Sequence, residues 1–322
     1  MASMTGRPVV LDPALLPPDR VRGYGLRSQA FVRDDAGPSE DLPPDERYAG
    51  RGVQHEVNNC GRLRCWSHSC DHTGDKFGEQ HGQQWVTGAP FTVFATGPRC
   101  TGRHAIENAR RRATERMEAL EWTAVEWAVM TGACGASPYL VGPADSEGIE
   151  LWIRPATPDG YTALAGWRVN DMSFTPQLPV GTDPVPVMTA IGALEWGARD
   201  YGGPGIIHAP SWSYPWFEDW EHREGARLVT QLGTGWAFGR GYPSVAPGTA
   251  QADMPGPDAP PDFESVWLYG TGAVRIWRSQ PITTPSYADY DYRQNRSMFL
   301  IERAYTVTIQ CPYTAVHVDL TQ

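Results

Sequence analysis

The residues best suited to chemistry lie in a polar segment that spans residues 51–84. Cys60, Cys65, Cys70 and His72 follow one another there with the spacing C-x4-C-x4-C-x-H. Thiolates and imidazoles that are close in sequence are the ligands that tetrahedral zinc selects. The spacing departs, however, from the C-x2-C pairs that usually turn tightly around one ion. A structural zinc site, disulfides and free thiols are therefore all compatible with the pattern, and we favour free thiols.

Catalysis by a zinc ion in this segment would require more than these ligands. A catalytic zinc needs an open coordination position and a general base nearby, and the sequence has no HExxH motif. A zinc-dependent hydrolase that uses the Cys/His-rich segment is therefore kept as an alternative function. Zinc is the one cofactor that the sequence suggests.

An aromatic and acidic segment, PSWSYPWFEDWEH, forms a second candidate site. In it Trp212, Trp216 and Trp220 lie beside Glu218 and Asp219. Paired carboxylates could hydrolyse a glycosidic bond, but tryptophan is also enriched in the centres of protein interfaces. We predict an interaction surface here, with a carbohydrate-binding module as a further alternative.

Two other signals are weaker. The glycines of GTGWAFG, residues 233–239, superficially resemble a dinucleotide-binding loop, but the third glycine comes one residue too late and no helix can follow. We interpret residues 233–242 as a glycine-rich turn. His208 follows a short apolar strand, and we interpret it as a histidine at the edge of the core or in an interface.

The composition excludes several classes of protein. The 322 residues carry a formal net charge of −10 at pH 7, and broad binding to nucleic acid needs basic clusters instead. No apolar run of about eighteen residues is present, so no membrane-spanning helix is predicted. The N-terminus also lacks the apolar core of a signal peptide. The 34 glycines and 29 prolines favour short strands, many turns and extended segments.

One long helix is predicted over residues 104–131. Its apolar residues recur at steps of three and four and form a stripe: Ile106, Ala109, Ala113, Met117, Leu120, Ala124 and Ala128. No proline or glycine interrupts the pattern before Gly132, so the helix would span about 40 Å. Trp122 and Trp127 flank the stripe, and we expect them to pack against neighbouring subunits.

Strands surround this helix in the sequence. Alternating side chains predict a strand within residues 85–96, and IELWIRP, residues 149–155, predicts another. A second helix is predicted over residues 184–201, and a strand begins at Ile206-Ile207. The C-terminal stretches VWLYG, AVRIWR, MFLIERAYTVTIQ and AVHVDL also have the alternation of strands. This mixture of helices and strands predicts an α+β fold.

The order of these elements resembles that of the major capsid proteins of tailed bacteriophages, the Hong Kong 97-type fold shared with encapsulins. The closing stretches FESVWLYGTGAVRIWRSQ and SMFLIERAYTVTIQCPYTAVHVDL are similar to the ending of that family. The resemblance implies an N-terminal arm over 1–50, an extended loop over 51–84, a peripheral domain over 85–180 with the spine helix 104–131, an inserted axial domain over 181–262, and a return to the peripheral domain over 263–322.

The resemblance implies a structural role without catalysis. Copies of the chain would form hexamers and pentamers and assemble into an icosahedral shell around double-stranded DNA, which they would touch only non-specifically. Scaffolding, cement and portal proteins are further expected partners, and no membrane is expected. The expected location is the virion capsid, assembled in the host cytoplasm. Another virion or tail-associated binding protein is the remaining alternative.

Overall fold

The structure is a computed structural model, and it describes residues 24–34, 53–56, 85–88, 90–97, 103–132, 180–199, 205–225, 227–247, 262–284, 299–309 and 313–321. Helices and strands both occur in these ranges, in runs and not in strict alternation, which confirms the predicted α+β class. The chain divides into two compact units, one of residues 1–20, 94–121 and 283–301, the other of residues 21–93, 122–282 and 302–322. The domain boundaries given above stay predictions.

The longest element is α3 (Arg103–Thr131), which confirms the helix predicted from the apolar periodicity. Gly132 follows its last residue, with a φ of 73° that suits glycine and an N–H that donates a 2.8 Å hydrogen bond to Ala128 O. The first part of α3, to Glu121, belongs to one compact unit, and the part from Trp122 belongs to the other. None of the described helices is long and apolar enough to cross a membrane.

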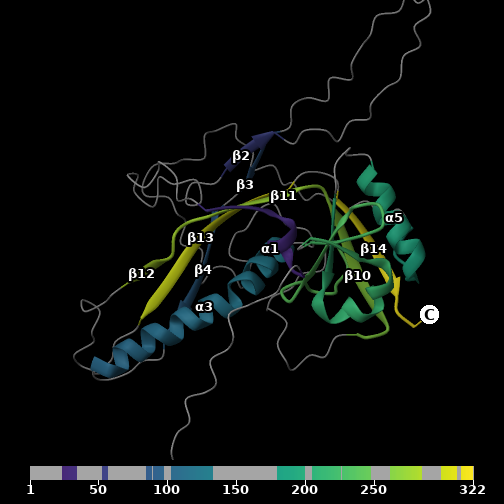
Figure 1. Cartoon of the computed structure of the whole chain (residues 1–322). Coiled ribbons are helices and arrows are strands. Elements are labelled where there is room, and N and C mark those ends of the chain that lie inside the picture. The colour runs from purple at the N-terminus through teal and green to yellow at the C-terminus, as the bar shows by residue number, and fades with distance from the viewer. Residues whose placement is uncertain are drawn as a thin grey trace, which may run out of the picture. The chain divides into compact units, whose positions relative to one another are not determined.

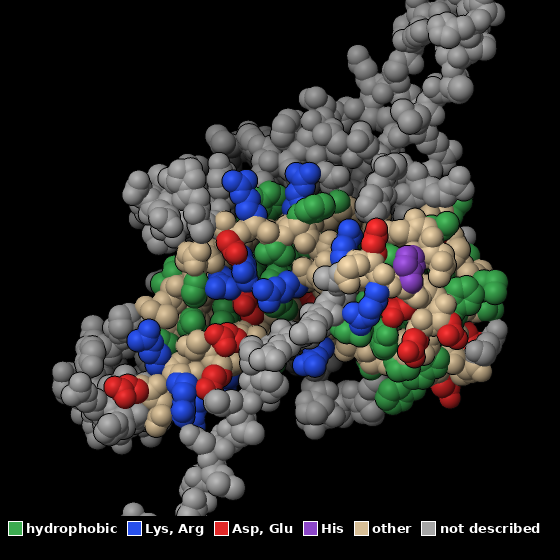
Figure 2. All heavy atoms as spheres, in the orientation of Figure 1, with side chains coloured by type: hydrophobic (Ala, Val, Ile, Leu, Met, Phe, Trp, Pro, Cys, Tyr) green, Lys and Arg blue, Asp and Glu red, His purple; other side chains and the backbone are tan. Residues whose placement is uncertain are grey.

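The buried side of α3 agrees only in part with the predicted stripe. Ala109, Ala113 and Met117 are buried, but Leu120 is 52% exposed. The prediction was wrong at Leu120 because the buried side there includes Trp122 instead. Basic and acidic side chains are mixed along the exposed side of the helix (Figure 2).

A five-stranded sheet joins segments from the two ends of the sequence (Figure 1). Its strands are β1 (Phe31–Asp34), β4 (Pro90–Thr96), β11 (Val274–Arg278), β12 (Ile282–Thr284) and β13 (Leu300–Ile309). Their order is β1-β11-β13-β12, and β4 also pairs with β13. β1 runs parallel to β11, whereas β11 and β13 are antiparallel.

A seven-stranded sheet has the order β5-β14-β10-β6-β9-β8-β7. Its strands are β5 (Val185–Pro186), β6 (Ile206–Pro210), β7 (His222–Glu224), β8 (Arg227–Val229), β9 (Gly235–Gly239), β10 (Ser265–Thr271) and β14 (Tyr313–Asp319). Helix α5 (Val187–Arg199) packs on β14 and β10. The predicted second helix is thus confirmed, although it begins three residues later than expected.

Strand β9 corrects the prediction of a glycine-rich turn. All five residues from Gly235 to Gly239 are buried, and they pair with β6 in parallel. A Cβ atom at Gly235 would lie 2.5 Å from Gln29 Oε1, and one at Gly239 would lie 2.7 Å from Glu126 Cδ. The glycines of β9 therefore permit close approach to a central strand, whereas Gly233, before the strand, does lie in a turn with a φ of 91°.

Two segments predicted to be irregular contain regular structure. Residues 24–34, expected in an extended arm, form α1 (Leu26–Gln29) and β1. In the expected extended loop, β2 (Val53–Glu56) forms an antiparallel ribbon with β3 (Trp85–Gly88). The strand predicted at residues 149–155 lies outside the described residues.

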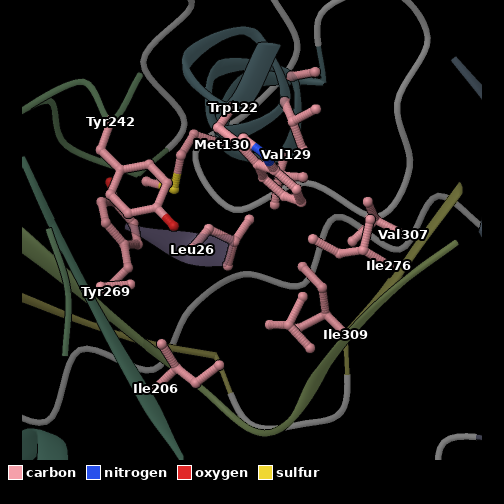
Figure 3. Close-up of a cluster of buried hydrophobic side chains, with 14 of the residues drawn as sticks. Leu26, Trp122, Val129, Met130, Ile206, Tyr242, Tyr269, Ile276, Val307 and Ile309 are labelled. Carbon is pink, nitrogen blue, oxygen red and sulfur yellow. The ribbon is translucent and has the colours of Figure 1, made fainter. Parts of the chain in front are cut away.

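Two apolar clusters form the core of the larger unit. One gathers side chains from α1, α3, β11 and β13, including Leu26, Trp122, Val129, Ile276 and Val307 (Figure 3). The other lies between α5, the seven-stranded sheet and the segment that follows β6. The C-terminal part of α3 is therefore a central element of the fold.

Candidate interaction surfaces and buried polar contacts

A buried carboxyl group on α3 connects three segments of the chain. Oε1 of Glu126 accepts a 3.0 Å hydrogen bond from the N–H of Leu26, and Oε2 accepts a 3.2 Å hydrogen bond from the N–H of Gly241. The side chain is 3% exposed. Because a buried backbone N–H without an acceptor is costly, this carboxyl group holds α1 and the turn after β9 against α3.

Three glycines leave the space that Glu126 occupies. A Cβ atom at Gly25 would lie 2.6 Å from Glu126 Oε1, and one at Gly239 would lie 2.7 Å from Oε2. At Gly241 a Cβ atom would meet backbone, 2.1 Å from Thr123 O. The site was missed by sequence reasoning, although an acidic residue inside the apolar run AVEWAVM is a usable signal.

His208 lies in the core and both of its ring nitrogens are hydrogen-bonded. Nε2 is 2.8 Å from Thr271 Oγ1, and Nδ1 is 2.9 Å from Tyr242 Oη. The Thr271 hydroxyl donates to Gly272 O, so it accepts from Nε2–H, and Nδ1 accepts from the tyrosine. Burial lowers the pKa of His208 to about 3. The neutral imidazole is therefore structural, and His208 lies inside the core and not at the edge of the core or in an interface as predicted.

A second buried carboxyl group joins α5 to the β8–β9 turn. Glu195 accepts hydrogen bonds from the hydroxyls of Thr230 and, at 2.8 Å, Thr234. Thr230 Oγ1 also accepts from the N–H of Thr234 at 3.2 Å. These contacts fix the turn, where Gly233 has a φ of 91°. Their donors and acceptors are satisfied, which is typical of a structural contact.

The aromatic and acidic segment folds as two short 3₁₀ helices, η4 (Ser211–Trp216) and η5 (Glu218–Trp220). Trp212, Trp216 and Trp220 are half-buried and pack against the second core cluster. Phe217, between them, is fully buried and fixes the segment to β9 by packing on Trp236. Part of the surface of each tryptophan thus stays exposed, and the interface predicted for them stays a prediction.

Two tyrosines, with an arginine and a glutamate, form contacts that stabilise the end of this segment. Tyr214 donates a 2.9 Å hydrogen bond to Glu221 Oε1, and its ring meets Tyr24 edge-on at 5.4 Å. Arg223 donates to the Tyr24 hydroxyl and lies over the same ring. Burial raises the pKa of Glu221, because the desolvated carboxylate is disfavoured. The hydrogen bond from Tyr214 therefore gives Glu221 a structural role in this segment.

Trp122 and Trp127 are not exposed interface residues. They are 5% and 6% exposed, and Trp122 belongs to the first core cluster. The guanidinium carbons of Arg27 and Arg278 lie 5.5 Å and 5.9 Å from the centre of the Trp122 ring. These tryptophans therefore pack within the chain, which corrects the expected contact with neighbouring subunits.

The candidate zinc ligands Cys60, Cys65, Cys70 and His72 lie outside the described residues. Within the described ranges, no group of three or more His, Cys, Asp or Glu side chains is arranged to hold a metal ion. The zinc site therefore stays an untested prediction.

Similar solved structures exist, although no protein-family model and no curated protein matches the chain. One is titled the capsid of an empty GTA particle, with 10% identity and a TM-score of 0.49 over 99% of this chain and 94% of that chain. A structure from Mycobacterium phage Bobi has 12% identity and a TM-score of 0.46 over 99% and 96%. The capsid of Ralstonia phage GP4 has 11% identity and a TM-score of 0.44 over 100% and 98%.

Proposed function

We propose that this chain is a structural subunit that assembles with copies of itself into the capsid shell of a tailed phage. The observation that carries the proposal is the place of α3 in the chain. A 29-residue helix follows the first strands, an α/β layer of α5 and β6–β9 comes next, and β11 and β13 then return to the first sheet. This is the order of spine helix, axial insertion and return that the resemblance implies.

Two further features support a role in assembly over one in catalysis. The described buried polar groups Glu126, Glu195 and His208 hold segments of the chain together. Large apolar side chains remain exposed on several elements, among them Phe31, Phe94, Met188, Trp196, Leu232 and Phe263. Exposed rings and apolar side chains of this size are typical of surfaces that bind other proteins.

In this proposal, copies of the chain form hexamers and pentamers of an icosahedral shell that encloses double-stranded DNA. Scaffolding, cement and portal proteins are the accessory partners. Assembly takes place in the host cytoplasm and the product is the virion capsid. The net charge of −10 suits a shell that must release its DNA, because broad affinity for phosphate would oppose packaging and ejection.

Electron microscopy of the purified chain tests the proposal. Negative staining should show closed particles or rings of uniform size. A chain that stays monomeric across salt, pH and protein concentration, with and without co-expressed virion proteins, would contradict it.

A further inference from the structure

The outer face of the β1–β11 strand pair carries arginine and aromatic side chains in alternation. In the parallel register Phe31 lies opposite Arg275, and Arg33 lies opposite Trp277. Successive side chains of a strand point to opposite faces, and Val32 packs against the core. We call Phe31, Arg33, Arg275 and Trp277 the basic face.

The basic face is open to a partner. Phe31 is 68% exposed, and both arginines are exposed. Among the described residues, neither Arg33 nor Arg275 has an ion-pair or hydrogen-bond partner for its guanidinium. Figure 2 shows Lys and Arg side chains gathered over the region where Figure 1 labels β11. Arginine beside exposed aromatic rings is the composition of the energetic centres of interfaces.

A face of opposite charge lies on the segment that follows β6. Glu218 and Asp219 are exposed there, and Glu264, just before β10, is also exposed. Trp212 brings them into one surface, because its ring meets Phe263, next to Glu264, edge-on at 5.5 Å. Phe263 is itself 54% exposed. We call these five residues the acidic face, and Figure 2 shows a group of acidic side chains on the right-hand part of the molecule.

We infer that the basic face of one copy of this chain binds the acidic face of the next copy. The inference rests on the proposed function and names the contact through which copies assemble. Charge complementarity selects this pairing, since each face carries exposed charges of one sign beside exposed rings.

The same charges exclude a symmetric pairing of either face with itself. Two basic faces would bring Arg33 and Arg275 of one copy against those of another, and two acidic faces would bring carboxylates together. Contact between unlike faces is heterologous, and such contacts build rings when the rotation closes. A ring of subunits is what a capsomer requires.

Charge reversal tests the pairing. One variant is Arg33→Glu with Arg275→Glu, and a second is Glu218→Arg with Asp219→Arg. Each alone should lower the fraction of chain in large particles by about tenfold, measured by sedimentation and negative-stain microscopy, because like charges then face each other. Combining all four substitutions in one chain should restore assembly, since both faces are then reversed and their charges are again opposite at every contact.

A matched control separates the face from the change in net charge. Arg110→Glu with Arg240→Glu alters two other exposed arginines and should leave assembly within about twofold of the unaltered chain. Circular dichroism should show the same helix content for all variants, which confirms that they fold.

The outcomes distinguish this inference from the proposed function. If the unaltered chain never assembles, both are wrong. If it assembles and the basic-face variant assembles equally well, or if the variant with all four substitutions fails to restore particles, the inference alone is overturned. If the basic-face variant forms normal particles but retains less DNA, the face contacts nucleic acid, and the inference is again overturned.

Discussion

The N–H of Leu26 donates a 3.0 Å hydrogen bond to Oε1 of Glu126, 100 residues further along the chain. The leucine side chain is fully buried in the first core cluster, beside Trp122 and Val129 (Figure 3). The N-terminal helix α1 is therefore held both by apolar packing and by a buried acceptor on α3. This contact makes residues near position 26 part of the folded unit.

Removal of the Glu126 acceptor should destabilise the chain. Glu126→Leu leaves the N–H groups of Leu26 and Gly241 without this partner, and each buried unsatisfied donor costs about 1–3 kcal/mol. We expect the free energy of unfolding in denaturant to fall by about 3 kcal/mol or more. Glu118→Gln, at an exposed position of the same helix, is the control and should change it by less than about 0.5 kcal/mol. Equal effects of the two substitutions would contradict the assigned role.

A methyl group at Gly241 should be tolerated poorly. Its Cβ atom would lie 2.1 Å from Thr123 O and 2.7 Å from Trp127 N, both backbone atoms of α3. Gly241→Ala should therefore lower the thermal unfolding midpoint, with a loss of about 3 kcal/mol. Gly192→Ala is the matched control, because nothing lies within 4 Å of a Cβ atom there, and in helix α5 it should stabilise by about 0.5–1 kcal/mol.

Stability should fall in acid because His208 is buried as the neutral imidazole. Its pKa is about 3 in the folded chain, against 6.5 for the ordinary side chain. The unfolded chain therefore binds a proton first as the pH falls below about 6.5. The stabilisation is fully present above that pH and is lost toward pH 3, with a slope of about 1.4 kcal/mol per pH unit from this group.

Denaturant unfolding at several pH values measures this slope. His208→Gln removes the titrating group and should flatten the dependence between about pH 4 and 6, even if the variant is less stable at pH 7. His222→Gln changes an exposed imidazole and serves as the control. An unchanged slope in His208→Gln would show that other groups cause the acid sensitivity.

Continuity of α3 should be necessary for assembly. Leu120→Pro removes a helix hydrogen bond and costs about 3 kcal/mol or more within the helix, so we expect no particles by negative-stain microscopy. Leu120→Ala is the control: because Leu120 is 52% exposed, its truncation should leave particles intact. Normal particles from the proline variant would show that the helix is not the scaffold of the subunit.

The sequence predicts those elements whose pattern is local. The periodicity of α3, the second helix and the alternation in β13 and β14 are visible within short windows, and the structure confirms them. The turn predicted at Gly233 to Tyr242 was wrong for Gly235 to Gly239, which form β9. The glycines at the ends of that strand make room for Gln29 and Glu126, which are distant in sequence. The burial of Leu120 was predicted wrongly for a related reason, because the side of a helix that is buried depends on which other elements pack against it.

The candidate surfaces were predicted only in part. Tryptophan and carboxylate side chains near residue 216 suggest a binding surface from their composition alone. The basic face could not be predicted, because its four residues come together only when β1 pairs with β11. No window of sequence contains both strands. The role of Glu126 as a buried acceptor could not be predicted, because the N–H groups that donate to it belong to Leu26 and Gly241, which lie on other segments.

The pairing of β1 with β11 also has a consequence for how the chain is made. Asp34 and Arg278, which pair in this register, are 244 residues apart, so a ribosome has translated most of the chain before β1 acquires its neighbour. An incomplete chain that stops before β11 cannot form the basic face. Growth of a shell through that contact would therefore reject chains truncated before β11, with no separate factor to inspect them.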